Sequence, residues 1–176
     1  EGRYDEMAVA LNAGLLVVFC VGPVLSVILY NVVPLAYPFL IADPEVIEVG
    51  IPYLQIRIMA IIFVASNFAF RGYWNAVDRS RLYMFTLVIM HGCNIFLNYV
   101  LIFGNLGFPE LGTTGAAIGT AVSTAIGTCT YIYLGFKYAR SEGFFRKKPS
   151  RTEIRKIVRL SVPSGIQQLF FSAGMT

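Results

Sequence analysis

The polar residues most able to do chemistry in this chain lie within one apolar, charge-free stretch, residues 82–109. His91, Asn94 and Asn98 stand at offsets of 0, 3 and 7, which places them on one face of a helix. Asn94 is about twelve residues, or roughly 18 Å of helix, from the nearer end of the stretch. These groups can line a substrate or proton path, or they can hydrogen-bond a neighbouring helix. The spacing leaves both interpretations open.

A single cation, Arg57, stands in a second apolar stretch, residues 49–70. A charge in such a stretch must pair, reach the interface or face water. Glu45 and Glu48 lie too far along the helix to pair with it, so the sequence predicts a partner on another helix. We favour a structural ion pair or a position in an outer vestibule over contact with a substrate.

The stretch 111–136 has a small residue at every fourth position, which lets neighbouring backbones approach closely. These residues are Gly115, Gly119, Ser123 and Gly127. Helix packing is the favoured role of this stretch, although Thr120, Ser123 and Thr124 can also offer hydroxyl groups to a cavity.

The sequence contains no enzyme signature. It has no paired carboxylates within an apolar run, no nucleophile beside a histidine, no cluster of metal ligands and no phosphate-binding glycine loop. The three cysteines lie in apolar runs without a CxxC motif, so we interpret them as packing residues. We therefore expect a protein that is not an enzyme and needs no cofactor.

The composition indicates the surroundings in which these residues work. The chain is 56% hydrophobic and only 14% charged, whereas soluble domains are about one quarter charged. A helix needs about 20 apolar residues to cross a bilayer. The sequence predicts an all-α, polytopic membrane protein with spans at about 7–33, 49–70, 82–109 and 111–136.

The ends of these spans carry further expectations. The first span should end before Pro34 and Pro38, because proline disfavours a helix interior. A fifth span begins near residue 160 and contains Gln167, a possible cavity or structural polar residue. The chain starts without Met and stops inside an apolar run, so we expect a fragment of a longer protein.

The loops predict the orientation. Basic residues fill the loops at 71–81 and 137–159, and they are absent from 43–48 and 104–110. This alternation puts the N-terminus and the basic loops in the cytoplasm. We interpret 137–159 as an inter-lobe loop that contacts anionic lipid rather than nucleic acid, with a short amphipathic helix at 152–160.

Two joined segments resemble the MATE (multidrug and toxic compound extrusion) transporters. They are NIFLNYVLIFG, from Asn94 to Gly104, and GFPELGTTGAAIGT, from Gly107 to Thr120. The resemblance covers the second- to sixth-helix part of the amino-terminal lobe and the start of the seventh helix, and the four spans correspond to the third through sixth helices. It implies a twelve-helix, two-lobe transporter that exports drugs and organic cations in exchange for H⁺ or Na⁺.

The resemblance also implies roles for individual residues. Asn94 and Asn98 match polar positions beside an essential Asp on the family's first helix, and Thr120 matches a small polar position of the same substrate and cation site. Some members carry Asp where this chain has Asn98, so protonation at that position is not available here. Ser172 stands near the position of a seventh-helix Glu of another subfamily, which favours coupling in the amino-terminal lobe.

The resemblance implies a multi-pass protein of the inner or plasma membrane that functions as a monomer at full length. Its expected partners are small organic cations and the lipid bilayer, without nucleic acid. Two alternatives stay open at this point: a flippase for lipid-linked or polysaccharide precursors, and a non-transporting membrane scaffold.

Overall fold

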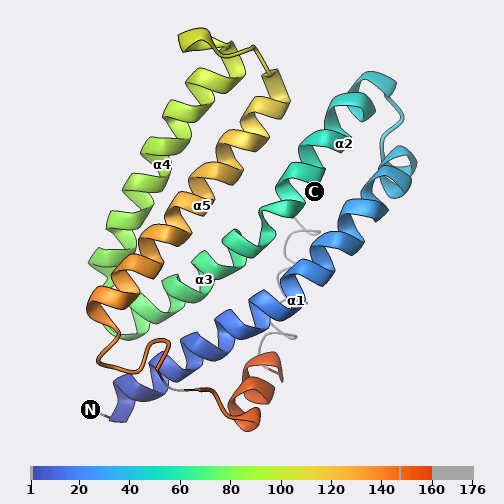
Figure 1. The fold of residues 1–176 in the computed structure, drawn as a ribbon. Coiled ribbons are helices and arrows are strands. Elements are labelled where there is room, and N and C mark those ends of the chain that lie inside the picture. The colour runs from blue at the N-terminus through green and yellow to red at the C-terminus, as the bar shows by residue number, and fades with distance from the viewer. Residues whose placement is uncertain (1, 147, 160–176) are drawn as a thin grey trace.

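The structure is a computed structural model that describes residues 2–146 and 148–159. This part of the chain consists of helices and contains no strand. The main helices are α1 (Gly2–Leu40), α2 (Pro44–Met59), α3 (Ile61–Ala76), α4 (Ser80–Phe103) and α5 (Gly112–Tyr138). A 3-10 turn, η1 (Asn105–Gly107), connects α4 to α5, and residues 151–159 form a further short helix (Figure 1). The predicted Gln167 and Ser172 lie outside the described residues.

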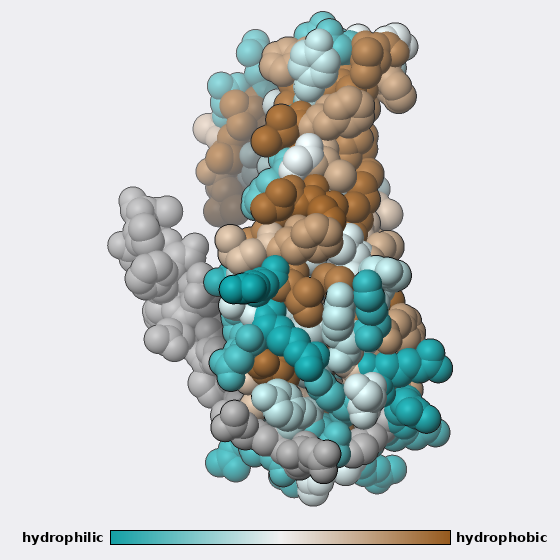
Figure 2. All heavy atoms as spheres, turned by 90° about the vertical axis from the view of Figure 1, so that its left-hand side faces the viewer, coloured by the Kyte–Doolittle hydropathy of each residue, from teal (hydrophilic) through white to brown (hydrophobic). Residues whose placement is uncertain are grey.

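The helices have the length and composition of membrane spans. Within the described residues α1, α4 and α5 each qualify, and α2 with α3 forms a fourth, bent span. Many large apolar side chains are exposed, among them Leu40 at 79% and Phe39 at 91%. Figure 2 shows apolar side chains over the upper part of one face and hydrophilic residues gathered at the lower end. Such exposure fits contact with lipid, so the prediction of a polytopic helical membrane protein is confirmed.

The first span is longer than predicted. We expected it to end before Pro34 and Pro38, but α1 continues through both prolines to Leu40. Pro34 has no N–H, so the Tyr30 carbonyl loses its usual helical donor. The side-chain Nε2 of Gln55, on α2, donates to that carbonyl at 3.2 Å. A neighbouring helix thus replaces the missing hydrogen bond, which lets the helix continue.

The second span, predicted as one helix over 49–70, is two helices that meet at a bend of 47°. The break lies at Ala60, between α2 and α3. The Ile58 carbonyl lies at this break and accepts a hydrogen bond of 3.2 Å from the buried hydroxyl of Ser26 on α1. Ala60 is neither glycine nor proline, so the sequence carried no sign of the bend at that position.

The third and fourth spans form a tight helical hairpin in which α4 and α5 lie side by side (Figure 1). The predicted third span reached residue 109, but α4 ends at Phe103 because Gly104 adopts a left-handed φ of 67°. The Leu111 N–H then donates to the Leu101 carbonyl at 3.0 Å. Gly115 on α5 faces the backbone at Leu101, where a Cβ atom would clash.

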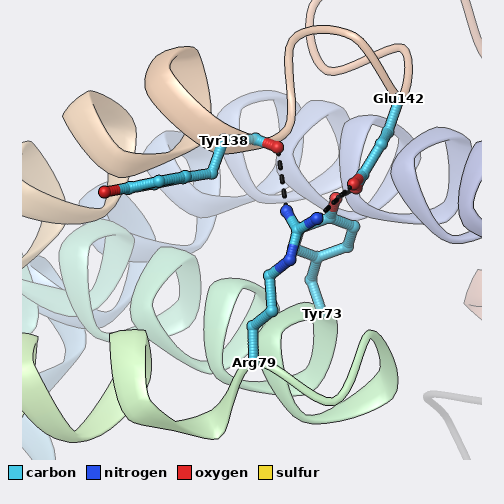
Figure 3. Close-up of polar contacts among 4 residues, drawn as sticks. All are labelled: Tyr73, Arg79, Tyr138 and Glu142. Carbon is cyan, nitrogen blue, oxygen red and sulfur yellow. Dashed lines mark hydrogen bonds and ion pairs between the residues drawn. The ribbon is translucent and has the colours of Figure 1, made fainter.

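A polar clasp joins the segments at the end of the bundle that carries the N-terminus. It consists of Tyr73, Arg79, Tyr138 and Glu142 (Figure 3). Arg79 Nη2 lies 2.9 Å from Glu142 Oε1, and its Nη1 donates to the Tyr138 carbonyl at 2.9 Å. Tyr73 donates to the other Glu142 carboxylate oxygen. The clasp ties the end of α5 and the following turn to the α3–α4 connection.

This end of the molecule gathers the described parts of the two basic loops, 71–81 and 137–159, whereas the base-free connections 41–43 and 104–111 lie at the opposite end (Figure 1). The alternation of the loops therefore agrees with the fold, and the cytoplasmic location of the basic end stays a prediction. Beneath the clasp lies an aromatic core that includes Phe70, Trp74, Tyr131 and Phe144.

The helix at 151–159 agrees with the predicted amphipathic helix as far as the structure describes it. It begins with a capping box, in which the Ser150 N–H donates to Glu153 Oε2 at 2.6 Å and the Glu153 N–H donates to Ser150 Oγ at 3.3 Å. The hydrogen bonds from Ser150 lower the pKa of the Glu153 carboxyl.

The hydrogen bond from Gln55 to the Tyr30 carbonyl, which replaces the one that Pro34 cannot donate, can be tested by a double-mutant cycle. Gln55→Leu should destabilise the full-length protein by about 1 kcal/mol, because the Tyr30 carbonyl is left without a donor. In a Pro34→Ala background the backbone N–H at position 34 can fill that place, so the same substitution should cost much less. Thermal unfolding in detergent measures both effects. Equal losses in the two backgrounds would contradict the assignment.

Candidate functional site

Asn94, Asn98 and Thr120, the three residues predicted to bind substrate or cation, lie together between α4 and α5. Asn94 Nδ2 is within hydrogen-bond distance of the hydroxyls of Thr120, at 3.4 Å, and Ser123, at 3.3 Å. Asn98 Nδ2 donates to Asn94 Oδ1 at 3.3 Å. We call these four residues the amide cluster. The spacing of Asn94 and Asn98, together with the resemblance at Thr120, therefore pointed to side chains that meet in space.

The amide cluster contains one unsatisfied acceptor. Asn98 Oδ1 is buried and has no hydrogen-bond partner within the described residues. It faces Gly119, where an added Cβ atom would lie 2.5 Å from it. A buried oxygen without a partner costs free energy, so it is suited to receive an O–H or N–H donor or a cation. The hydroxyls of Thr120 and Ser123 donate to backbone carbonyls of α5, so their oxygen atoms can accept from Asn94 Nδ2.

A second group of polar residues joins α3 to α5, and sequence reasoning missed two of its members, Asn67 and Thr128. Asn67 Nδ2 donates to the Thr124 carbonyl at 3.2 Å, and Thr128 Oγ1 donates to Asn67 Oδ1 at 2.9 Å. The Thr124 hydroxyl in turn donates to the Thr120 carbonyl. Asn67 is an amide within the second predicted span, so its polarity was the available signal.

A groove of about 280 Å³ runs between α2, α3, α4 and α5. Thr120 belongs both to the amide cluster and to the lining of this groove, which Asn67 and Thr124 also line. Arg57 of α2 and Arg71 of α3 line it as well. None of the lining residues among the described part of the chain is acidic. The groove and the amide cluster together form the candidate site.

The other predicted polar residues have separate positions. Arg57 is half-buried and has no hydrogen bond or ion pair with any described residue, so the predicted ion-pair partner is not found there. His91 is exposed on α4, does not line the groove and forms no hydrogen bond within the described residues. Its position one turn from Asn94 therefore does not bring it into the amide cluster.

Gly119→Ala tests the geometry of the amide cluster. The added methyl group would press on the Asn98 oxygen and force α4 and α5 apart, so we expect a loss of about 1–3 kcal/mol in stability. Gly92→Ala is the matched control, because a Cβ atom there meets nothing within 4 Å. Thermal unfolding of the full-length variants checks this. Equal stability of the two variants would show that the close contact at Gly119 does not exist.

A model of the MatE family matches residues 1–100. The probable multidrug resistance protein NorM of Bacillus thuringiensis subsp. konkukian is 30% identical over 173 residues, which cover 96% of this chain and 38% of that protein. Its namesake in Thermotoga maritima is 31% identical over 126 residues, covering 70% and 27% respectively. The chain thus spans well under half the length of these relatives.

The fold agrees with this relationship. A crystal structure of a MATE protein in the bent conformation aligns with a TM-score of 0.78 and 20% identity, covering 98% of this chain and 43% of that one. The match of more than half of the chain to the family model, together with the relatives, shows that this chain belongs to the MATE family of multi-pass membrane proteins.

Proposed function

We propose that the full-length protein is a secondary antiporter of the plasma membrane that exports drugs and organic cations in exchange for H⁺ or Na⁺. Membership of the family and the multidrug-resistance names of its relatives support this function over the flippase and scaffold alternatives. The observation that carries the proposal is the amide cluster, which has a buried and unpartnered Asn98 oxygen and shares Thr120 with the lining of the groove.

The chemistry of the amide cluster sets the kind of role that it can have. Amides and hydroxyls present oxygen atoms to a cation, but they do not titrate near neutral pH. Asn94 and Asn98 therefore solvate and position a cation or a protonated group, and they do not carry the proton themselves. The resemblance implies an essential Asp on the family's first helix beside these residues. Neutral oxygen atoms beside such a carboxylate would bind the coupling ion or substrate and would add no further charge to the site.

The groove supplies the path that this role requires. Its volume of about 280 Å³ is close to the lower end of ligand pockets, which begin at about 300 Å³. Apolar side chains, including Val64, Phe68 and Leu87, contribute to its lining. Such a lining suits an organic molecule with an apolar body, and the amide cluster provides polar contacts at the Thr120 edge. We propose that the full-length protein does this as a monomer and without a cofactor.

Asn98→Ala in the full-length protein tests the proposal. Removal of the free oxygen should lower gradient-driven export of a cationic dye from inverted-vesicle or whole-cell preparations by about tenfold, which is the effect of one hydrogen bond to a charged group. Asn105→Ala is the matched control, since Asn105 lies outside the groove and donates to the Tyr99 carbonyl.

Two results would contradict the proposal. Export by Asn98→Ala at the rate of the unsubstituted protein would reduce Asn98 to a packing residue. Dye export that is unchanged after collapse of both the proton and the sodium gradient would exclude cation-coupled antiport itself.

A further inference from the structure

Arg57 is a charged residue that has no part in the role proposed for the amide cluster. It lies in the last turn of α2, about 20 Å of helix from Pro44, and therefore well inside the roughly 30 Å hydrocarbon layer. The carboxyl-terminal end of a helix carries partial negative charge, which stabilises a cation by a modest amount. Its guanidinium has no hydrogen bond or ion pair with any described residue. A cation at this depth needs a counter-charge or water.

The surroundings of Arg57 favour a negative ligand. It lines the same groove as Arg71, and no acidic side chain lines this groove within the described residues. Asn67 and Thr120 add polar groups to the wall that both arginines share. Arg71 is exposed, and its guanidinium lies 5.1 Å from the centre of the Tyr83 ring. The wall formed by this part of the chain is therefore positively charged near the two arginines, which attracts an anionic group.

We propose that Arg57 binds a carboxylate carried by the transported molecule, so that substrates with both a cationic and an anionic group are preferred. This inference rests on the proposed export function and specifies the substrate class for it. The planar guanidinium can donate two parallel hydrogen bonds to a carboxylate. Arg57 and Thr120 line one groove, so the carboxylate binds at Arg57 while the rest of the molecule extends toward the amide cluster.

A matched pair of dyes tests the proposal: a rhodamine with a free carboxyl group and the methyl ester of the same rhodamine. Binding to the purified full-length protein is measured by fluorescence polarisation, and export is measured in cells. Arg57→Gln should raise the Kd of the free acid about tenfold, because a charge-assisted hydrogen bond is lost. The Kd of the ester should stay within about twofold of its value for the unsubstituted protein.

Two further variants serve as controls. Arg57→Lys keeps the charge but loses the two-pronged geometry, so it should recover part of the affinity for the free acid. Arg81→Gln removes one positive charge from an exposed position in the first turn of α4, outside the groove, and should change neither Kd.

Several outcomes would overturn the proposal. An unchanged Kd of the free acid in Arg57→Gln would do so. Arg57→Gln can instead weaken the binding of both dyes equally, or it can reduce the amount of folded protein while Arg57→Lys restores folding without any preference for the free acid. Either result would identify a structural ion pair with a carboxylate elsewhere in the full-length protein. Failure of the unsubstituted protein to export either dye would contradict the antiporter function, while the binding measurement would still decide the role of Arg57.

Discussion

The hydrocarbon layer offers no water to a peptide group, and this constraint determines how the described helices fit together. At two interruptions of the backbone ladder, a side chain from another helix provides the missing partner. Gln55 donates to the Tyr30 carbonyl, one helical turn before Pro34. Ser26 donates to the Ile58 carbonyl at the break in the second span. Both hydrogen bonds join α1 to α2, so these two irregular places in the backbone also hold the two helices together.

The same irregularities shape the candidate site. Because the second span bends at Ala60, α2 and α3 approach α5 at different angles, and both contact it. Arg57 comes from the first half of the span, whereas Asn67 comes from the second half, and the two line one groove. Small residues on α5 then let α4 approach until Asn98 lies against Gly119. The groove therefore depends on one broken helix and one close helix pair.

Much of this arrangement could be predicted from the sequence, because membrane insertion imposes strong patterns on it. Long apolar stretches with at most one charge predicted the spans, and the spacing of Asn94 and Asn98 with the Thr120 match predicted most of the amide cluster. The continuation of α1 through Pro34 and the break at Ala60 could not be predicted, because each depends on a hydrogen bond from a distant segment. Asn67 was missed for a related reason, since only the fold brings it to Thr128.

The central claim is that the groove beside the amide cluster is a water-accessible binding site. The most direct measurement places a cysteine at Thr120 (Thr120→Cys) in a full-length protein whose native cysteines are replaced by serine, with Phe96→Cys on the exposed face of α4 as the comparison. A water-soluble thiol reagent should label position 120, and an organic-cation dye should protect it, while position 96 should stay unlabelled. Labelling at position 120 that is absent, or that the dye does not change, would contradict the account.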